Sequence, residues 1–134
     1  MSGTSSLTIV RGGGTTYQDL YLQAASSTVT GGTIFLGNGS TPAATTFQIN
    51  CINPLFNLVV DATTNTKTAQ LVVNPITIKN DLNINGNSVF NANGLSVNIG
   101  RNLTNSNSTA TTGLSVGGYR PSTAAQTTTF NGSL

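Results

Sequence analysis

Side chains that could carry acid–base or metal chemistry are few in this chain. There are three carboxylates, Asp19, Asp61 and Asp81, and no Glu or His. A Ser–His–Asp triad, a Cys–His pair and a His-containing zinc site therefore cannot be assembled. Cleavage of a glycosidic bond needs two facing carboxylates, for which only Asp61 and Asp81 qualify. Both stand among turn-forming residues, so the sequence predicts that they stabilise turns.

The basic residues allow one further enzymatic hypothesis. Parallel β-helices often carry polysaccharide lyase sites, which use calcium-binding acids and a Lys or Arg base. Lys67, Lys79 or Arg101 could supply that base, but three acids are too few for the usual oxygen cage around calcium. The sequence therefore predicts a protein that is not an enzyme, with no catalytic, cofactor-binding or metal-binding residues.

The single cysteine and the low charge further limit the classes of function that the chain could have. Cys51 is the only cysteine and lies within apolar alternation, so a buried, unreactive thiol is expected. The net charge of +2 comes from scattered bases with no cluster for phosphates, which argues against nucleic-acid binding. No apolar run approaches the roughly 18 residues of a membrane span. Only 6% of residues are charged, and Thr, Asn, Ser and Gly fill the surface instead.

Short apolar alternation is the dominant structural signal. Segments of three to five residues place apolar side chains at a spacing of two, which predicts strands, and no stretch sustains a helical pattern. The expected strands are Leu7–Ile9, Leu20–Leu22, Ile34–Leu36, Phe47–Ile49, Phe56–Val60, Leu71–Val73, Ile76–Ile78, Leu82–Ile84, Val89–Phe90, Leu95–Ile99 and Leu114–Val116. Gly-Gly and Asn-Gly pairs separate them, as tight corners require.

The spacing of these segments favours a parallel β-solenoid. Three short strands joined by sharp corners make one turn of roughly 20–25 residues, so the chain would hold roughly five to six turns. Asn-Gly pairs also occur in type I′ hairpins, so an antiparallel β-sandwich is the structural alternative. A sandwich usually has longer strands and an aromatic core residue such as Trp, which this chain lacks.

The chain also resembles itself. Phe35-Leu-Gly-Asn-Gly-Ser40 returns as Thr129-Phe-Asn-Gly-Ser133, and Ser6-Leu-Thr-Ile9 returns near Leu95-Ser-Val-Asn-Ile99. Both offsets are roughly 90 residues. We therefore interpret residues 1–134 as a single solenoid segment holding about one and a half copies of a long repeat, with a copy boundary near 93–100. On this interpretation the chain is a fragment of a longer protein.

One order of motifs resembles a known class of proteins. It runs through Phe56-Asn-Leu58, Ile76-Thr-Ile-Lys-Asn-Asp-Leu82, Asn93-Gly94 and Asn102-Leu-Thr-Asn105. This order is similar to the repeats of very large cell-surface proteins of the Bacteroidetes, including gliding-motility adhesins. Arg101 stands where those repeats carry Gly, and the resemblance covers residues 38–134 better than residues 1–37.

This resemblance implies an extracellular stalk or adhesive filament, exported to the cell surface and anchored through regions absent from the chain. The expected partners are adjacent repeats or other copies stacked end to end, with surface glycans as a further candidate. Nucleic acid and membrane insertion are not expected. Two alternatives remain open: an intertwined, trimeric phage or viral fibre, and a carbohydrate-binding module with Tyr17, Tyr21 or Tyr119 as stacking platforms.

Overall fold

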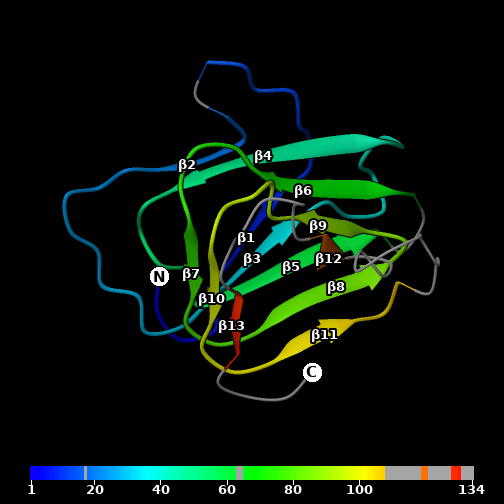
Figure 1. The fold of residues 1–134 in the computed structure, drawn as a ribbon. Coiled ribbons are helices and arrows are strands. Elements are labelled where there is room, and N and C mark those ends of the chain that lie inside the picture. The colour runs from blue at the N-terminus through cyan, green and yellow to red at the C-terminus, as the bar shows by residue number, and fades with distance from the viewer. Residues whose placement is uncertain (17, 63–64, 108–118, 121–127, 131–134) are drawn as a thin grey trace.

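The alternating segments form short strands that pair only in parallel. The computed structural model describes residues 1–16, 18–62, 65–107, 119–120 and 128–130, and within these ranges there is no helix. Figure 1 shows the strands grouped into three sheets that enclose a common interior. Every pair of hydrogen-bonded strands in the described residues is parallel. The fold is thus an all-β parallel β-solenoid, and the antiparallel alternative is wrong.

Each sheet collects one strand from successive turns. Sheet 1 contains β1 (Ser6–Ile9), β3 (Thr33–Leu36), β5 (Asn57–Ala62), β8 (Leu82–Gly86) and β11 (Leu103–Asn105). Sheet 2 contains β2 (Leu20–Leu22), β4 (Thr45–Cys51), β6 (Lys67–Leu71), β9 (Val89–Asn91) and β12 (Tyr119–Arg120). Sheet 3 contains β7 (Ile76–Ile78), β10 (Val97–Ile99) and β13 (Thr128–Phe130). From β5 onward the chain visits the three sheets in a fixed order.

The solenoid has about four turns rather than the five or six expected. In sheet 1 the paired positions Ser6, Thr33 and Asn57 are separated by 27 and 24 residues. Later turns shorten to 21 residues between Leu82 and Leu103. The last turn is longer again, because 31 residues separate Val97 from its partner Thr128. The long first and last turns consume the residues that the expected extra turns would need.

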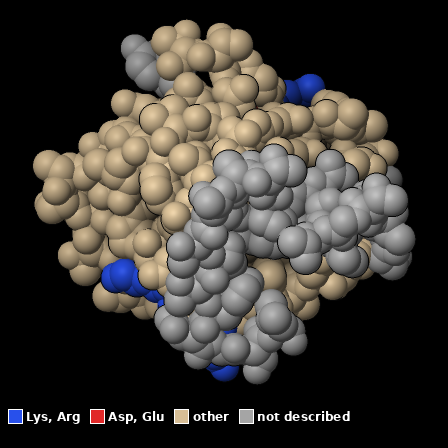
Figure 2. Space-filling view, in the orientation of Figure 1, with Lys and Arg blue, Asp and Glu red and all other residues tan. Residues whose placement is uncertain are grey.

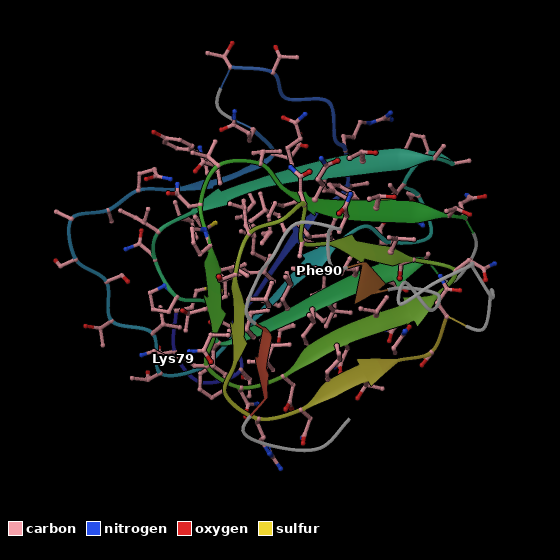
Figure 3. All side chains as sticks on the ribbon, viewed as in Figure 1. Lys79 and Phe90 are labelled. Carbon is pink, nitrogen blue, oxygen red and sulfur yellow. The ribbon has the colours of Figure 1, made fainter. Side chains whose placement is uncertain are left out.

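Inward side chains stack in columns from turn to turn. In sheet 1, Ile34, Leu58 and Leu82 occupy successive register positions and are buried. In sheet 2, Ala69 lies between Phe47 and Phe90 in register, and all three are fully buried. The small side chain leaves room for the two rings, and Figure 3 shows Phe90 pointing into the interior. Burial of these columns stabilises each turn against its neighbours, not within itself.

The strands of the structure differ from the predicted alternating segments at several places. The expected strand Leu71–Val73 is largely a corner, since β6 spans Lys67–Leu71 and Val73 is exposed. The alternation did not mark β11, β12 or β13. It missed β11 because the only apolar residue of this strand is Leu103, although the motif Asn102-Leu-Thr-Asn105 is part of the resemblance described above. The expected strand Leu114–Val116 lies outside the described residues. The repeat of roughly 90 residues stays a prediction.

Candidate functional site

Side-chain amides join the turns at the corner between sheet 3 and sheet 1. Asn57 stands at the start of β5, and its Oδ1 accepts hydrogen bonds from Asn80 Nδ2 at 2.8 Å and from the Asp81 backbone N–H at 3.2 Å. Its Nδ2 donates to the Gly32 carbonyl and to Thr33 Oγ1, both at 3.3 Å. One side chain therefore connects three successive turns.

Asp81 continues this corner into the following turn. Its Oδ1 accepts from the backbone N–H of Asn102 at 3.2 Å and from Asn102 Nδ2 at 3.1 Å, and its Oδ2 accepts from Asn80 Nδ2 at 3.2 Å. We call Thr33, Asn57, Asn80, Asp81 and Asn102 the corner ladder. The turn-stabilising role expected for Asp81 is confirmed, and the carboxylate is engaged by donors of its own fold.

The corner between sheets 1 and 2 holds the fully buried Lys67. Lys67 occupies an inward position of β6, and its Nζ donates to the Asn65 carbonyl at 3.2 Å. Its aliphatic stem passes against Gly37, where a Cβ would come within 2.5 Å of Lys67 Cδ. Ser88 follows in the next turn, is also fully buried, and donates to the Val60 carbonyl at 2.7 Å. An ammonium group in this position has no access to an external substrate, so Lys67 is unsuited to be the base of a surface lyase site.

The two carboxylates considered as an acid pair lie at opposite ends of sheet 1. Asp81 is beside Asn57 at the start of β5, whereas Asp61 is the second-last residue of that strand and pairs in register with Asn85 of β8. The prediction that Asp61 stabilises a turn was therefore wrong, because the strand continues through it. Along β5, Asp61 lies four residues beyond Asn57, and four residues of strand span about 13 Å. The carboxylates of Asp61 and Asp81 are separated by about this length. Glycosidase carboxylates lie at most about 9.5 Å apart. Asp61 and Asp81 are therefore too far apart to flank one scissile bond.

Asp19 and Lys79, which were also considered from the sequence, form hydrogen bonds with backbone groups of the fold. Asp19 accepts from the N–H groups of Gly14 and Gln48, at 2.8 and 2.7 Å, and so fixes the entry into sheet 2. Lys79 lies at the periphery (Figure 3), and its Nζ donates to the Val29 carbonyl at 3.1 Å. Within the described ranges, no three His, Cys, Asp or Glu residues gather to hold a metal ion. No helix of the described chain is long and apolar enough to cross a membrane.

Cys51 is a buried thiol in sheet 2. It is 2% exposed, and its Sγ lies 3.6 Å from the Leu20 carbonyl. Burial raises the pKa of the Cys51 thiol to about 12, although a hydrogen bond with the backbone of Leu22 acts in the opposite direction. Since the thiolate is the nucleophile, Cys51 is unreactive near neutral pH, as the sequence indicated.

The raised pKa of Cys51 predicts a loss of stability in alkali. Between about pH 9 and 12 the folded thiol keeps its proton while the unfolded thiol releases it, so rising pH favours unfolding. The free energy of unfolding should fall by up to about 1.4 kcal/mol per pH unit from this group. Urea titrations of the wild type and Cys51→Ala between pH 8 and 11 measure the effect as a difference. Parallel pH curves for the two proteins would contradict the prediction.

An apolar cavity of about 260 Å³ opens at the end of the solenoid formed by β1 and β2. It lies beneath the segment 23–32, where the first turn has no sheet 3 strand. Side chains at its wall include Leu7, Leu22, Val29, Ile34, Leu55 and Phe56. Leu7 and Leu22 are 47% and 36% exposed, respectively. Two apolar side chains of the first turn are thus only partly covered at this end, while Leu20 of β2 is buried.

Known proteins were compared with the chain at three levels. Family models, curated protein sequences and solved structures all give no match. The fold and the side chains described above are therefore the basis for inferring a function.

Sequence reasoning did not find the open end or the buried lysine. The alternation marks Leu7 and Leu22 as inward, but it cannot show that nothing covers them on one side. Lys67 is missed because lysine is almost never fully buried without a partner. The one signal for it is its spacing of two from Ala69 and four from Leu71, which places it on the inward face.

Proposed function

We propose that this chain is a structural, adhesive segment of a large extracellular repeat protein that forms a stalk or filament on the cell surface. The observation that carries the proposal is the uninterrupted stack of parallel turns, in which inward aliphatic columns and the corner ladder recur from turn to turn. A turn of this kind cannot bury its apolar face alone, so the architecture extends by adding turns. The chain is not proposed to catalyse a reaction.

The chemistry of the surface suits an extracellular filament. Figure 2 shows a few isolated Lys and Arg residues among described residues that are otherwise uncharged on this face. In the described residues, side-chain hydrogen bonds between turns involve amide and hydroxyl groups such as those of Asn57, Asn80 and Thr33. Salt screens charged pairs but leaves amide hydrogen bonds and apolar packing in place. Cohesion of the stack should therefore tolerate changes in ionic strength outside a cell.

The pairing of strands favours this proposal over an intertwined trimeric fibre. In such a fibre, neighbouring strands of a sheet would come from different chains. Here each of the three sheets is built from successive turns of one chain. This supports a single-chain solenoid, as in the giant surface repeat proteins of the Bacteroidetes that the motifs resemble.

Immunogold electron microscopy of the source cells tests the proposed location. An antibody raised against this chain should label intact cells, with gold particles lying outside the outer boundary of the cell. Antibody preabsorbed with the purified chain is the control and should leave the cells unlabelled. Labelling that requires permeabilised cells would overturn the proposal, because a stalk or filament must be accessible from outside.

A further inference from the structure

Strand β1 is an unprotected edge of sheet 1. It is the outermost strand of this sheet on the side of the first turn, and Ser6, Leu7 and Thr8 are all exposed. Edge strands that remain unpaired are usually shielded by charged residues or by proline. The segment Ser6–Ile9 contains neither. Its sequence therefore leaves this edge open to pairing with another strand.

The backbone of β1 offers hydrogen-bonding groups on the side away from β3. The Ser5 and Ile9 carbonyls accept hydrogen bonds from two backbone N–H groups of the next turn, each at 2.9 Å. Parallel strands bond through alternate residues, so the N–H and C=O groups of Ser6, Thr8 and Val10 face the opposite way. Another strand can bond to these groups without displacing any hydrogen bond between β1 and β3.

The apolar core is only partly covered at this edge. Leu7 pairs in register with Ile34, which is followed by Leu58, yet Leu7 is 47% exposed while the other two are 3% and 0% exposed. Ile9, the next inward residue of β1, is partly buried against the core. The difference within the column comes from position in the stack, since all three side chains are aliphatic. A strand paired with β1 would bury Leu7.

The edge of β1 is complementary to the same edge of a second copy. A two-fold axis perpendicular to sheet 1 brings two β1 strands together antiparallel and keeps the inward faces of both sheets on the same side. A two-fold axis along the strands would pair them in parallel, but it would turn the core face of one sheet outward. Only the antiparallel arrangement therefore joins both the backbone edges and the apolar cores.

We propose that two copies of this chain pair through β1, antiparallel, across a two-fold axis at Thr8. The two Thr8 residues exchange backbone hydrogen bonds, and Ser6 of each copy does the same with Val10 of the other. Leu7 of one copy lies opposite Ile9 of the other on the core face, so sheet 1 continues from one solenoid into the next. This pairing goes beyond the proposed function, because it names a partner and does not depend on where the protein is displayed.

The same axis provides a cover for the apolar cavity. In the later turns the chain passes from sheet 1 to sheet 2 and returns to sheet 1 through sheet 3. The two-fold axis reverses the direction of sheet 1, so β2 of one copy lies over the sheet 3 side of the other. That is the side where the first turn has no strand and the cavity opens. Leu22, which is 36% exposed, thereby approaches the cavity of the other copy. Both copies use the same surface, so the assembly stops at a dimer.

Sedimentation velocity and light scattering over a wide concentration range test the pairing. The wild type should change from a monomer to a discrete dimer as its concentration rises. Leu7→Asp puts a carboxylate into the contact, and Thr8→Pro removes an N–H that faces away from β3. Each variant should raise the dissociation constant of the dimer by at least about tenfold. Asn98→Asp is the matched control and should dimerise like the wild type, because Asn98 is exposed on β10, between β7 and β13.

Disulfide formation tests the position of the two-fold axis. Directly opposite residues of a hydrogen-bonded antiparallel pair have Cα atoms about 5.5 Å apart, a separation that a disulfide can span. In oxidised glutathione, Thr8→Cys should therefore form a covalent dimer at least about tenfold faster than the exposed control Asn98→Cys. The native Cys51 is buried in both variants.

Each outcome decides between this pairing and its alternatives. A wild type that stays monomeric at all concentrations, or that grows beyond a dimer, overturns the proposal. Equal dimerisation of Leu7→Asp, Thr8→Pro and the wild type, or equal cross-linking of Thr8→Cys and Asn98→Cys, overturns it as well. Far-UV circular dichroism checks that the variants are folded; if Leu7→Asp is not, the Thr8→Pro and cross-linking results decide. A monomeric chain that immunogold still places on the cell surface would refute the pairing alone and leave the proposed function standing.

Discussion

Replacing Gly37 by alanine is expected to lower the free energy of unfolding by about 3 kcal/mol. Gly37 has a φ of 92°, in the left-handed region that disfavours residues with a Cβ. An added Cβ would also lie 2.5 Å from Lys67 Cδ and 2.8 Å from the Asp61 carbonyl oxygen. Lys67 is fully buried, so its stem cannot move aside into solvent. Urea unfolding followed by far-UV circular dichroism measures the loss.

Gly39 provides a matched control two residues away. Its Cβ would have no atom within 4 Å and its φ is not in the positive range, so Gly39→Ala should be neutral or slightly stabilising. A double-mutant cycle with Lys67→Ala separates the two causes at Gly37. Removing the lysine stem should relieve the steric part of the Gly37→Ala loss and leave the conformational part. Equal losses at Gly37 and Gly39 would contradict the close approach of Lys67.

The class of fold could be predicted from the sequence because strands and corners carry strong local signals. Inward positions such as Leu82 and Ile84 alternate with polar ones, and pairs such as Asn93-Gly94 mark corners, where both residues adopt positive φ. The short spacing between these signals favoured a solenoid over a sandwich. The number of turns was overestimated because alternation does not measure loops. The long connections of the first turn carry no periodic pattern, and the connections of the last turn carry only the short alternation Leu114–Val116.

The functional surface could not be predicted in the same way. The cavity exists because the segment 23–32 passes where later turns place a strand of sheet 3, and no residue type marks that difference. The burial of Lys67 depends on the missing Cβ of Gly37, which is 30 residues earlier in the chain. The partners within the corner ladder likewise come from different turns. Asn and Asp were recognised as corner residues, but only the register shows which of them meet.

The corner ladder links the fold to the proposed role, since a filament must resist separation of its turns. Apolar columns hold neighbouring turns together and oppose a one-residue slip between them, which would turn the inward side chains outward, but a two-residue slip keeps the same face inside. Directional bonds such as those of Asn57 and Asp81 set the register at each corner. The loss of one rung should consequently weaken cohesion between turns more than the loss of an exposed amide on the same solenoid.

Asn57→Ala is accordingly expected to lower the free energy of unfolding by about 2–3 kcal/mol. The substitution removes an acceptor from Asn80 and from the Asp81 N–H, and a donor from the Gly32 carbonyl and Thr33 Oγ1. Water can replace some of these partners because the corner is only partly buried, which keeps the loss below the sum of four buried bonds. Urea unfolding of the variant and the wild type under identical conditions gives the difference.

Asn98→Ala supplies the comparison that identifies the cause. Asn98 is an exposed residue of β10 on the outer face of sheet 3, so its truncation should change stability by less than about 0.5 kcal/mol. Amide hydrogen exchange adds a local measurement. In Asn57→Ala the N–H of Asp81, which donates to Asn57 Oδ1 in the wild type, should lose protection, whereas the N–H of Gly100, which donates to the Ile78 carbonyl, should keep it. If the Asn57 and Asn98 variants are equally stable, the apolar columns alone hold the turns together.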